Sequence, residues 1–228
     1  MTYSDIRRVA RENLSGNWGL SIGACLLAAI MGGMLIGSSF LPQLNFHMEN
    51  QDIESWEQFF RVTLGSTTLS VNTINLVHFI LGGVIQLGYA QFLLKQYNRA
   101  NFEVKDLFSQ FERFGQAFLQ RFLRILYTSL WSLLFIIPGI VKSYAYAMTP
   151  FIMAENPEMT ASEAITASKE LMDGHKADLF FLQLSFIGWA ILNVFTLGIG
   201  SLWLVPYINA SYAAFYRSIC NRRDNVVE

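Results

Sequence analysis

The chain alternates between long apolar runs, almost free of charge, and short polar segments that carry most of its ionisable residues. The apolar runs cover residues 19–41, 69–94, 125–137, 140–154 and 179–216. A helix needs about 20 apolar residues to cross a membrane. The glycine pair in Gly198-Ile199-Gly200 divides the last run into two arms. The pattern predicts an all-α integral membrane bundle of six spans in three hairpins, filling residues 1–228 as one domain.

The central hairpin is the least regular part of this pattern. Pro138-Gly139 breaks an apolar run, which suits a structural hairpin tip at a membrane face. The flanking runs are short, and Arg121, Arg124 and Lys142 have long stems that can snorkel from their ends. Two thin or tilted spans, or one partly re-entrant hairpin, fit these lengths. We favour two spans because a helix satisfies its own backbone groups when it crosses fully.

Three amphipathic helices are expected beside the hairpins. The first covers Ser4–Leu14 and has an interfacial pattern, with arginines on one side. The second lies before Arg124. The third starts at Thr160, which forms a capping box with Glu163, and ends at Gly174. Their apolar faces consist of Ile6, Val9, Ala10 and Leu14; of Leu107, Phe108, Phe111, Phe114, Phe118 and Phe122; and of Ala161, Ala164, Ile165, Ser168, Leu171 and Met172. A further stripe of Ile53, Trp56, Phe60 and Leu64 suits a helix on the outer leaflet.

An internal repeat is one interpretation of this order. Each amphipathic helix would end near a glycine, and each hairpin returns through a Tyr-Ala pair. The glycines are Gly16, Gly115 and Gly174, and the pairs are Tyr89-Ala90, Tyr144-Ala145 and Tyr212-Ala213. The repeat units would be residues 4–100, 105–156 and 160–222. The small residues Gly23, Gly32, Gly33 and Gly37 would let the first span approach its neighbours closely.

The distribution of charge sets the orientation. Only 14% of the 228 residues are charged and the net charge is −1, which argues against a nucleic-acid partner. All lysines and arginines except Arg61 and Lys142 fall in segments on one side of the predicted spans. The positive-inside rule therefore places both termini in the cytoplasm and the chain in the cytoplasmic membrane.

Motifs for catalysis and for metal or cofactor binding are missing from the sequence. It has no phosphate-binding loop, no His-Glu-x-x-His and no Gly-x-Ser-x-Gly. Cys25 and Cys220 have no partner at metal-ligand spacing. His175 with Asp173 and Asp178 fits a solvated helix end better than a cation site, and Glu155 and Glu158 fit a polar linker. We expect no enzyme activity, no cofactor and no metal.

Lys142 is the most informative charge in the chain. It follows the hairpin tip among apolar and aromatic residues, and an ionisable group at membrane depth is a functional candidate. No acidic residue lies between Glu112 and Glu155, so an ion-pair partner must be distant in sequence or external, such as a lipid phosphate or a solute carboxylate. A snorkelling lysine is the alternative. The candidate ligand-binding or lipid-binding residues are Lys142, Tyr144, Gln86, Tyr207 and Asn209.

Several segments carry a resemblance to a known family. They are residues 137–146 and 168–174, Gly188-Trp189, and residues 200–216 with Pro206-Tyr207 and Phe215-Tyr216. In these the chain resembles an uncharacterised bacterial family of multi-pass membrane proteins, domain of unknown function 975. The resemblance implies a membrane location and no particular activity. A more distant likeness to the membrane domain of glycerophosphodiester phosphodiesterases suggests lipids, although no phosphodiesterase motif is present.

The expected function is therefore non-catalytic. The protein would bind lipid or an amphiphilic solute, or stabilise a membrane complex; its partners would be membrane lipids and a membrane protein or a second copy. The alternative is a small transporter with a polar path near Lys142. A transporter requires Gln86, Lys142, Asn193 and Asn209 to converge on a cavity, whereas a lipid binder requires Lys142 beside a lateral groove. In a structural role these side chains would be used in helix contacts.

Overall fold

The computed structural model describes residues 3–31, 73–134, 136–196 and 198–227. These residues form helices joined by turns, so the predicted all-α class is confirmed for them. The helices are α1 (Tyr3–Leu14), α2 (Trp18–Ile30), α4 (Thr73–Tyr97), the 3₁₀ turns η1 (Val104–Phe108) and η2 (Phe111–Arg113), α5 (Phe114–Leu134), α6 (Ile136–Ala145), α7 (Thr149–Glu155), α8 (Ala161–Leu171), α9 (Lys176–Leu184), α10 (Ile187–Phe195) and α11 (Ser201–Val227). The predicted outer helix at residues 53–64 and the end of the first apolar run lie outside the described residues.

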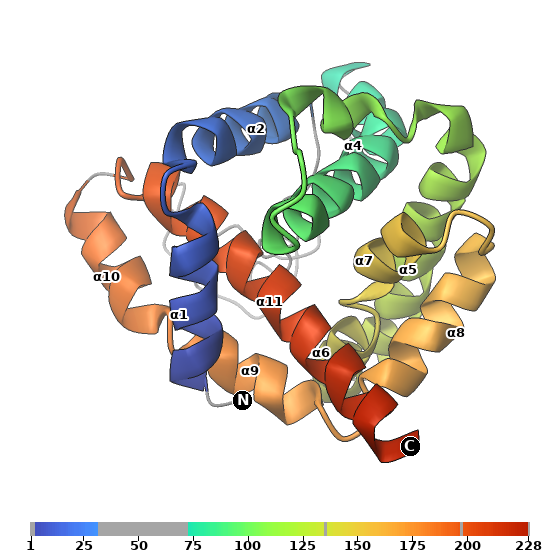
Figure 1. The fold of residues 1–228 in the computed structure, drawn as a ribbon. Helices are drawn as coiled ribbons and strands as arrows, with labels where there is room; N and C mark the ends of the chain where they lie inside the picture. The colour runs from blue at the N-terminus through green and yellow to red at the C-terminus, as the bar shows by residue number, and fades with distance from the viewer. Residues whose placement is uncertain (1–2, 32–72, 135, 197, 228) are drawn as a thin grey trace, which may run out of the picture.

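Helix α11 is the centre of the arrangement. It crosses the middle of Figure 1, with α1, α9 and α10 on one side and α4, α5 and α8 on the other. It packs against α1, α2, α4 and α10. The turn at Gly198, where φ is +85°, separates α10 from α11, as the sequence predicted. Pro206 lies inside α11, which continues through it.

The central hairpin differs from the prediction at both ends. Helix α5 is one continuous helix from Phe114 to Leu134, so Gly115 lies in its first turn and ends no helix. Of the predicted second amphipathic helix, Leu107 and Phe108 lie in η1 and Phe111 lies in η2, whereas the part from Phe114 onward shares α5 with the following span. Pro138 and Gly139 lie in the first turn of α6, so these two residues are helical and do not form the predicted hairpin tip. Proline is tolerated there because a first helical turn has no intrahelical acceptor for its N–H groups.

Two predicted arms are broken into shorter helices. The return arm of the central hairpin divides into α6 and α7, and the first arm of the last hairpin divides into α9 and α10. Pro150 lies in the first turn of α7 and cannot continue α6. Two backbone carbonyls at the break accept hydrogen bonds from side chains. Ser168 Oγ donates to Ala145 O at 2.9 Å, and Thr149 Oγ1 donates to Tyr146 O at 2.9 Å.

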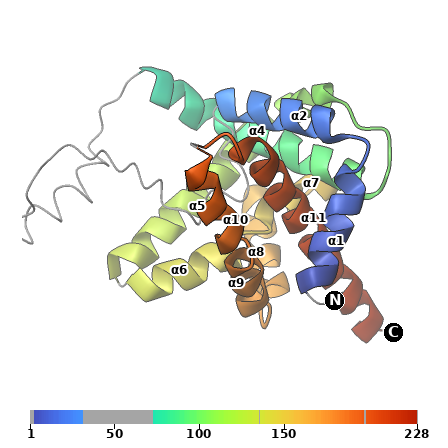
Figure 2. The same ribbon diagram turned by 90° about the vertical axis from the view of Figure 1, so that its left-hand side faces the viewer.

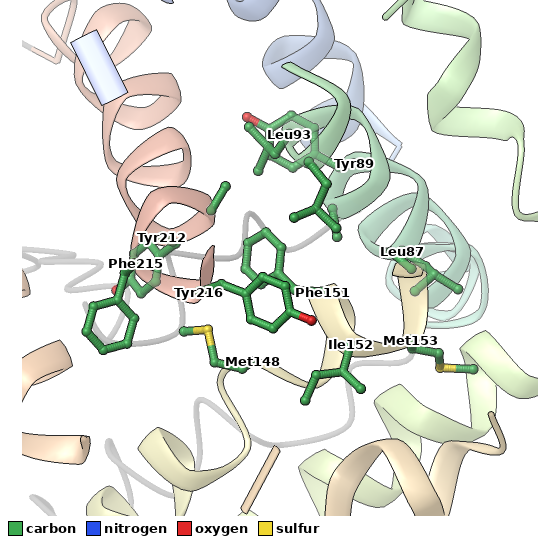
Figure 3. Packing of buried hydrophobic residues seen from close by; sticks show 14 of the residues in the cluster. Leu87, Tyr89, Leu93, Met148, Phe151, Ile152, Met153, Tyr212, Phe215 and Tyr216 are labelled. Atoms are coloured by element: carbon green, nitrogen blue, oxygen red, sulfur yellow. The ribbon is translucent and has the colours of Figure 1, made fainter. Parts of the chain in front are cut away.

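The hydrophobic core lies where α4, α7 and α11 meet. Residues 149–154 of α7 are all buried. The ring of Phe151 stacks on that of Tyr216, with 5.4 Å between centroids, and the residues around this pair come from α4, α7 and α11 (Figure 3). The largest fully buried side chains include Tyr89, Phe92 and Phe215. The core thus joins the three predicted hairpins through aromatic and methionine side chains.

The first and third amphipathic helices form as predicted, but their apolar faces contact protein. In α1, Ile6, Ala10 and Leu14 are buried, and Ala10 and Leu14 pack with Ala210 of α11. In α8 the whole predicted face is buried, against α5 and α7. The capping box is present, because Thr160 N donates to Glu163 Oε2 (2.8 Å) and Glu163 N donates to Thr160 Oγ1 (3.4 Å). Gly16 and Gly174 have φ of +83° and +77°, as residues after helix ends often do.

Close backbone approach occurs at glycines other than those predicted. A Cβ on Gly88 would lie 2.1 Å from Leu107 O, and one on Gly83 would lie 2.5 Å from Ala117 O. A Cβ on Gly139 would lie 2.8 Å from Ser132 Cα, which shows how tightly α6 packs on α5. Gly23 has no atom within 4 Å of such a Cβ, and the other three predicted glycines lie outside the described residues. Among the described glycines, Gly83 and Gly88 of α4 and Gly139 of the central hairpin therefore allow close approach, whereas Gly23 of α2 does not.

The longest described helices are α4, α5 and α11, with 25, 21 and 27 residues. Among the helices that the structure describes, none combines the length and the apolar character that a membrane-crossing helix needs.

Candidate functional site

Lys142 lies on α6, half-buried, with an aromatic neighbour. Its Nζ is 4.7 Å from the centroid of the Trp131 ring on α5. A cation over a tryptophan face is attracted by the negative face of the ring, with a free energy of about 0.5–1 kcal/mol at exposed sites. The sequence argument looked only for a distant or external anion, and the structure supplies a local partner eleven positions away.

Gln86 is 2% exposed on α4 and accepts a hydrogen bond from Arg124 Nη2 of α5 at 2.8 Å. Arg121, one turn before Arg124, is 6% exposed. Both arginines were predicted to snorkel outward, but Arg121 is buried and Arg124 reaches inward to α4. The sequence indicated this contact in part, since a polar residue such as Gln86 in a predicted span commonly forms hydrogen bonds between helices. Gln86 is therefore used in packing α4 against α5.

Three tyrosines from the Tyr-Ala pairs tie helices together. Tyr144 donates from its hydroxyl to Gln183 Oε1 of α9 at 2.6 Å, and Gln183 Nε2 donates to the hydroxyl of Tyr212. The hydroxyl of the buried Tyr89 lies close to Cys25 and to the side chain of Asn209. Asn209 is fully buried and also donates to Val205 O at 2.9 Å. Tyr144 and Asn209 therefore belong to buried hydrogen-bonded contacts between helices.

Glu155 has a structural contact that the sequence did not predict. It accepts a hydrogen bond from the Tyr216 hydroxyl at 2.6 Å and forms an ion pair with Arg217. The carboxylate thereby ties the end of α7 to α11. The sequence allowed a helix end or a cation site at His175 with Asp173 and Asp178. In the structure His175 Nδ1 lies 3.0 Å from Asp178 Oδ2, and the Tyr3 hydroxyl donates to Asp178 Oδ1 at 3.2 Å. No group of three or more metal-ligating side chains occurs within the described part of the chain.

A pocket of about 320 Å³ lies between the α1–α2 junction and the last hairpin. In Figure 1, α1 lies beside α10 and the start of α11. The residues that line the pocket are mostly aromatic and aliphatic, with one cation and a few small polar groups. The lining residues are Arg11, Trp18, Trp189, Leu192, Asn193, Thr196, Gly200, Trp203, Leu204 and Tyr207.

Local contacts hold this pocket together. The Tyr207 hydroxyl donates to Arg7 O at 3.4 Å, and the Tyr207 ring packs edge-on against Phe186 at 5.3 Å. Arg7 Nη1 in turn donates to Ser185 O at 3.3 Å. These contacts fix α1 against both arms of the last hairpin.

Asn193 carries the most unusual polar atom of the pocket. Its Oδ1 is buried and has no hydrogen-bond partner among the described residues. Thr196 Oγ1 donates to Asn193 O at 2.9 Å and accepts from Gly200 N at 3.1 Å, so the turn leaves the side-chain oxygen out of its own network. A buried acceptor without a donor costs about 1–3 kcal/mol. Because Oδ1 is packed against Gly200, a ligand donor recovers that free energy once the Asn193 amide rotates toward the pocket.

The predicted site residues do not converge. Lys142 lies on the central hairpin, Gln86 between α4 and α5, and Asn209 with Tyr89; only Tyr207 and Asn193 share the pocket. Sequence reasoning missed Arg11, Trp18, Trp189 and Trp203. The sequence offered one local signal for these residues, since the basic Arg11 comes shortly before Trp18. Nothing in the sequence indicates that Arg11 lies near Trp203.

No curated protein and no solved structure matches this chain. A family model described as "Protein of unknown function (DUF975)" matches residues 1–142 and 133–223. These two matches extend over most of the 228 residues and include every helix that forms the pocket. The chain therefore belongs to the DUF975 family.

Proposed function

We propose that this protein resides in the cytoplasmic membrane as a six-span, three-hairpin bundle and binds lipid without catalysing a reaction. Both termini would lie in the cytoplasm. Membrane lipids are its proposed partners, with a second membrane protein or a second copy of the chain as a further partner.

The observation that carries the proposal is the exposure of large apolar side chains at the hairpin ends. Leu133 is 83% exposed, Ile137 76% and Phe195 80%. Many neighbours on these elements are also exposed, including Leu130, Trp131, Ile140, Val141, Phe181, Leu184, Ile187, Trp189, Ile191, Leu192, Ile199 and Trp203. Soluble monomers rarely leave apolar surface of such extent in water. Hydrocarbon around these side chains removes that cost, since burying one is worth about 1.5–3 kcal/mol.

The placement of charge supports the same orientation. Apart from Lys142, residues 125–154 carry no lysine, arginine or aspartate, and residues 179–216 carry no charge at all. Figure 2 shows the end of α5 and the start of α6 on the side of the molecule away from both labelled termini. Ion pairs occur nearer the termini, such as Arg8 with Asp5 at 3.4 Å. Uncharged helices that are set apart from the charged segments suit a protein whose helices lie in lipid and whose charged segments lie in water.

The contacts of the polar residues favour lipid binding or structural support over transport. Gln86 and Asn209 are hydrogen-bonded between or along helices, and Lys142 lies over Trp131. The pocket that does contain Tyr207 and Asn193 opens beside exposed tryptophans, where a lipid could enter from the side.

The proposal is tested by depth measurement in reconstituted vesicles. A single cysteine replaces Leu133 in a Cys25→Ala, Cys220→Ala background and carries an environment-sensitive fluorophore; the matched control carries it at Lys169 on α8. We expect the Leu133 probe to be blue-shifted and quenched by lipids brominated on their acyl chains, and the Lys169 probe to remain aqueous. Release of the chain from cell membranes by alkaline carbonate, or equal aqueous emission from both probes, would refute a membrane-embedded hairpin.

Orientation needs a second measurement. An impermeant thiol reagent applied to whole cells should label a cysteine at Gln51, a position outside the described residues, and should spare one at Lys169. The reverse pattern would overturn the cytoplasmic placement of the termini.

A further inference from the structure

The pocket between the α1–α2 junction and the last hairpin has the features of a ligand site. Its volume of about 320 Å³ falls at the lower end of the range of small-molecule sites, about 300–1,000 Å³. Of the described residues that line it, Arg11 alone carries a charge. It also holds the buried Oδ1 of Asn193, which has no partner among those residues.

Arg11 favours an anion. It lies in the last turn of α1, is exposed, and makes no ion pair with another described residue, whereas Arg8 on the same helix is paired with Asp5 and Glu12. A guanidinium can bind a phosphate through two parallel N–H donors. None of the described residues that line the pocket is acidic, so none of them repels such a group.

Asn193 and the tryptophans restrict the ligand further. An unpartnered acceptor is satisfied by a ligand that donates from a hydroxyl group. Trp189, Leu192 and Trp203 are 52%, 54% and 52% exposed and form an apolar exit from the pocket. The volume is too small for a whole diacyl lipid, so acyl chains would leave along this exit while the headgroup stays inside.

We propose that this pocket binds the headgroup of one anionic phospholipid whose phosphodiester carries a hydroxylated substituent, as in phosphatidylglycerol. The phosphate lies against Arg11, a headgroup hydroxyl donates to Asn193 Oδ1, and the acyl chains cover Trp189 and Trp203. This assignment names a ligand class for the proposed lipid-binding function. It rests on that function because a membrane is the source of the lipid.

Binding is measured with water-soluble dihexanoyl lipids below their micelle concentration, added to the full chain in a neutral detergent. Tryptophan fluorescence is the readout, in a Trp56→Phe, Trp131→Phe background that retains the three pocket tryptophans. We expect dihexanoylphosphatidylglycerol to bind saturably and at least tenfold more tightly than dihexanoylphosphatidylcholine, which is zwitterionic and has no hydroxyl donor. Phosphatidylmethanol of the same chain length, with equal charge and no hydroxyl, should bind several-fold more weakly.

Three variants assign the contacts. Arg11→Gln should weaken phosphatidylglycerol binding at least tenfold, as the loss of a charge-assisted hydrogen bond implies, and Arg11→Lys should retain part of it. Asn193→Ala should abolish the preference for phosphatidylglycerol over phosphatidylmethanol. Arg8→Gln, the matched control on the same helix outside the pocket, should bind as the parent does. Circular dichroism and melting verify that each variant is folded.

The outcomes separate the alternatives. Equal binding of the three lipids, or no effect of Arg11→Gln, would overturn the proposal and leave the tryptophans as an interfacial belt. If glycerol-1-phosphate binds as tightly as dihexanoylphosphatidylglycerol, the pocket takes a soluble anion and the lipid assignment is wrong. Because these ligands are soluble monomers, the result does not depend on membrane insertion. A chain that binds them but is released by carbonate would refute the membrane location and not the pocket.

Discussion

Replacing Gly88 by alanine tests whether close backbone approach holds α4 against η1. A Cβ at this position would lie 2.1 Å from Leu107 O, 2.6 Å from Leu107 C and 2.8 Å from Leu107 Cα. All three are backbone atoms, so no side-chain rotation relieves the overlap. Leu107 itself is fully buried, and Asp106 is held by Lys95 Nζ of α4 at 2.7 Å. The 3₁₀ turn therefore cannot move away without breaking other contacts.

The magnitude is the difference of two effects. Alanine is a better helix former than glycine by about 1 kcal/mol. Overpacking a filled site costs about 1–3 kcal/mol, and contacts with backbone belong at the upper end of that range. The net effect for Gly88→Ala is a loss of about 2 kcal/mol in the free energy of unfolding. For a chain of this size each kcal/mol moves the melting temperature by about 2–4 °C, so we expect a decrease of about 4–8 °C.

Gly23→Ala is the matched control. Gly23 lies in α2, is exposed, and has no atom within 4 Å of a built Cβ, so only the gain in helix propensity applies. Its melting temperature should equal or exceed that of the parent by a few degrees. Both variants are followed by circular dichroism on the detergent-solubilised chain. A Gly88→Ala protein that melts at or above the parent temperature would show that the packing of α4 on η1 is not as close as described.

Three further changes test contacts elsewhere. Thr160→Ala removes the helix cap of α8 and should cost about 1 kcal/mol in thermal unfolding at pH 7; an unchanged melting temperature would contradict the cap. The backbone N–H of Thr160, and after it the Thr160 side chain, lowers the pKa of Glu163 from its ordinary value. The stabilisation is therefore present above the unfolded-state pKa and is lost as pH falls through the folded-state pKa. Thr160→Ala removes only the side-chain contribution, so the difference in stability between parent and variant should shrink in acid, and a difference that grows in acid would be the wrong sign. Glu155→Gln should lower the free energy of unfolding by about 1–2 kcal/mol because Tyr216 and Arg217 lose a charged partner. The control Glu158→Gln, at an exposed position, should leave stability unchanged. Equal effects of the two changes would show that Glu155 has no structural role. Lys142→Met should lower stability by at most about 1 kcal/mol in the same assay, and a larger loss would mean that the ammonium has a stronger partner than an aromatic ring.

Local sequence signals predicted the elements that local chemistry determines. Thr160, Glu163 and Gly174 specify both ends of α8, and the period of its apolar residues identified the buried face. The glycine at 198 specified the last turn in the same way. In each case the stabilising groups lie within a few residues of the element, so a sequence window contains them.

The elements that the sequence analysis placed wrongly depend on contacts between residues far apart in the chain, which no short stretch of sequence contains. Gly115 resembles a helix end, yet α5 continues because its face packs on α4 and α8. Pro138-Gly139 resembles a turn, but Gly139 is needed where α6 passes within contact of Ser132. The break between α6 and α7 is stabilised by Ser168, 23 residues away from the carbonyl that it satisfies. The pocket is the extreme case, since Arg11 and Trp203 belong to opposite ends of the chain.

The packing of α1 on α11 has a consequence for the order in which the protein folds. The hydroxyl of Tyr207 donates to the carbonyl of Arg7 across 200 positions, and Ala10 and Leu14 are covered by Ala210. A ribosome adds about 5–20 residues per second. Helix α1 is thus synthesised roughly 10–40 s before the helix that covers it.

During that interval Ala10 and Leu14 lack the contact with Ala210 that covers them. Under the membrane location proposed above, a basic amphipathic helix in this state would bind an anionic bilayer surface, which would shield Ala10 and Leu14 until α11 emerges. The same face would thus serve first as a surface anchor of the nascent chain and later as a core contact. Closing α11 onto α1 is then the step that brings together the two sides of the pocket.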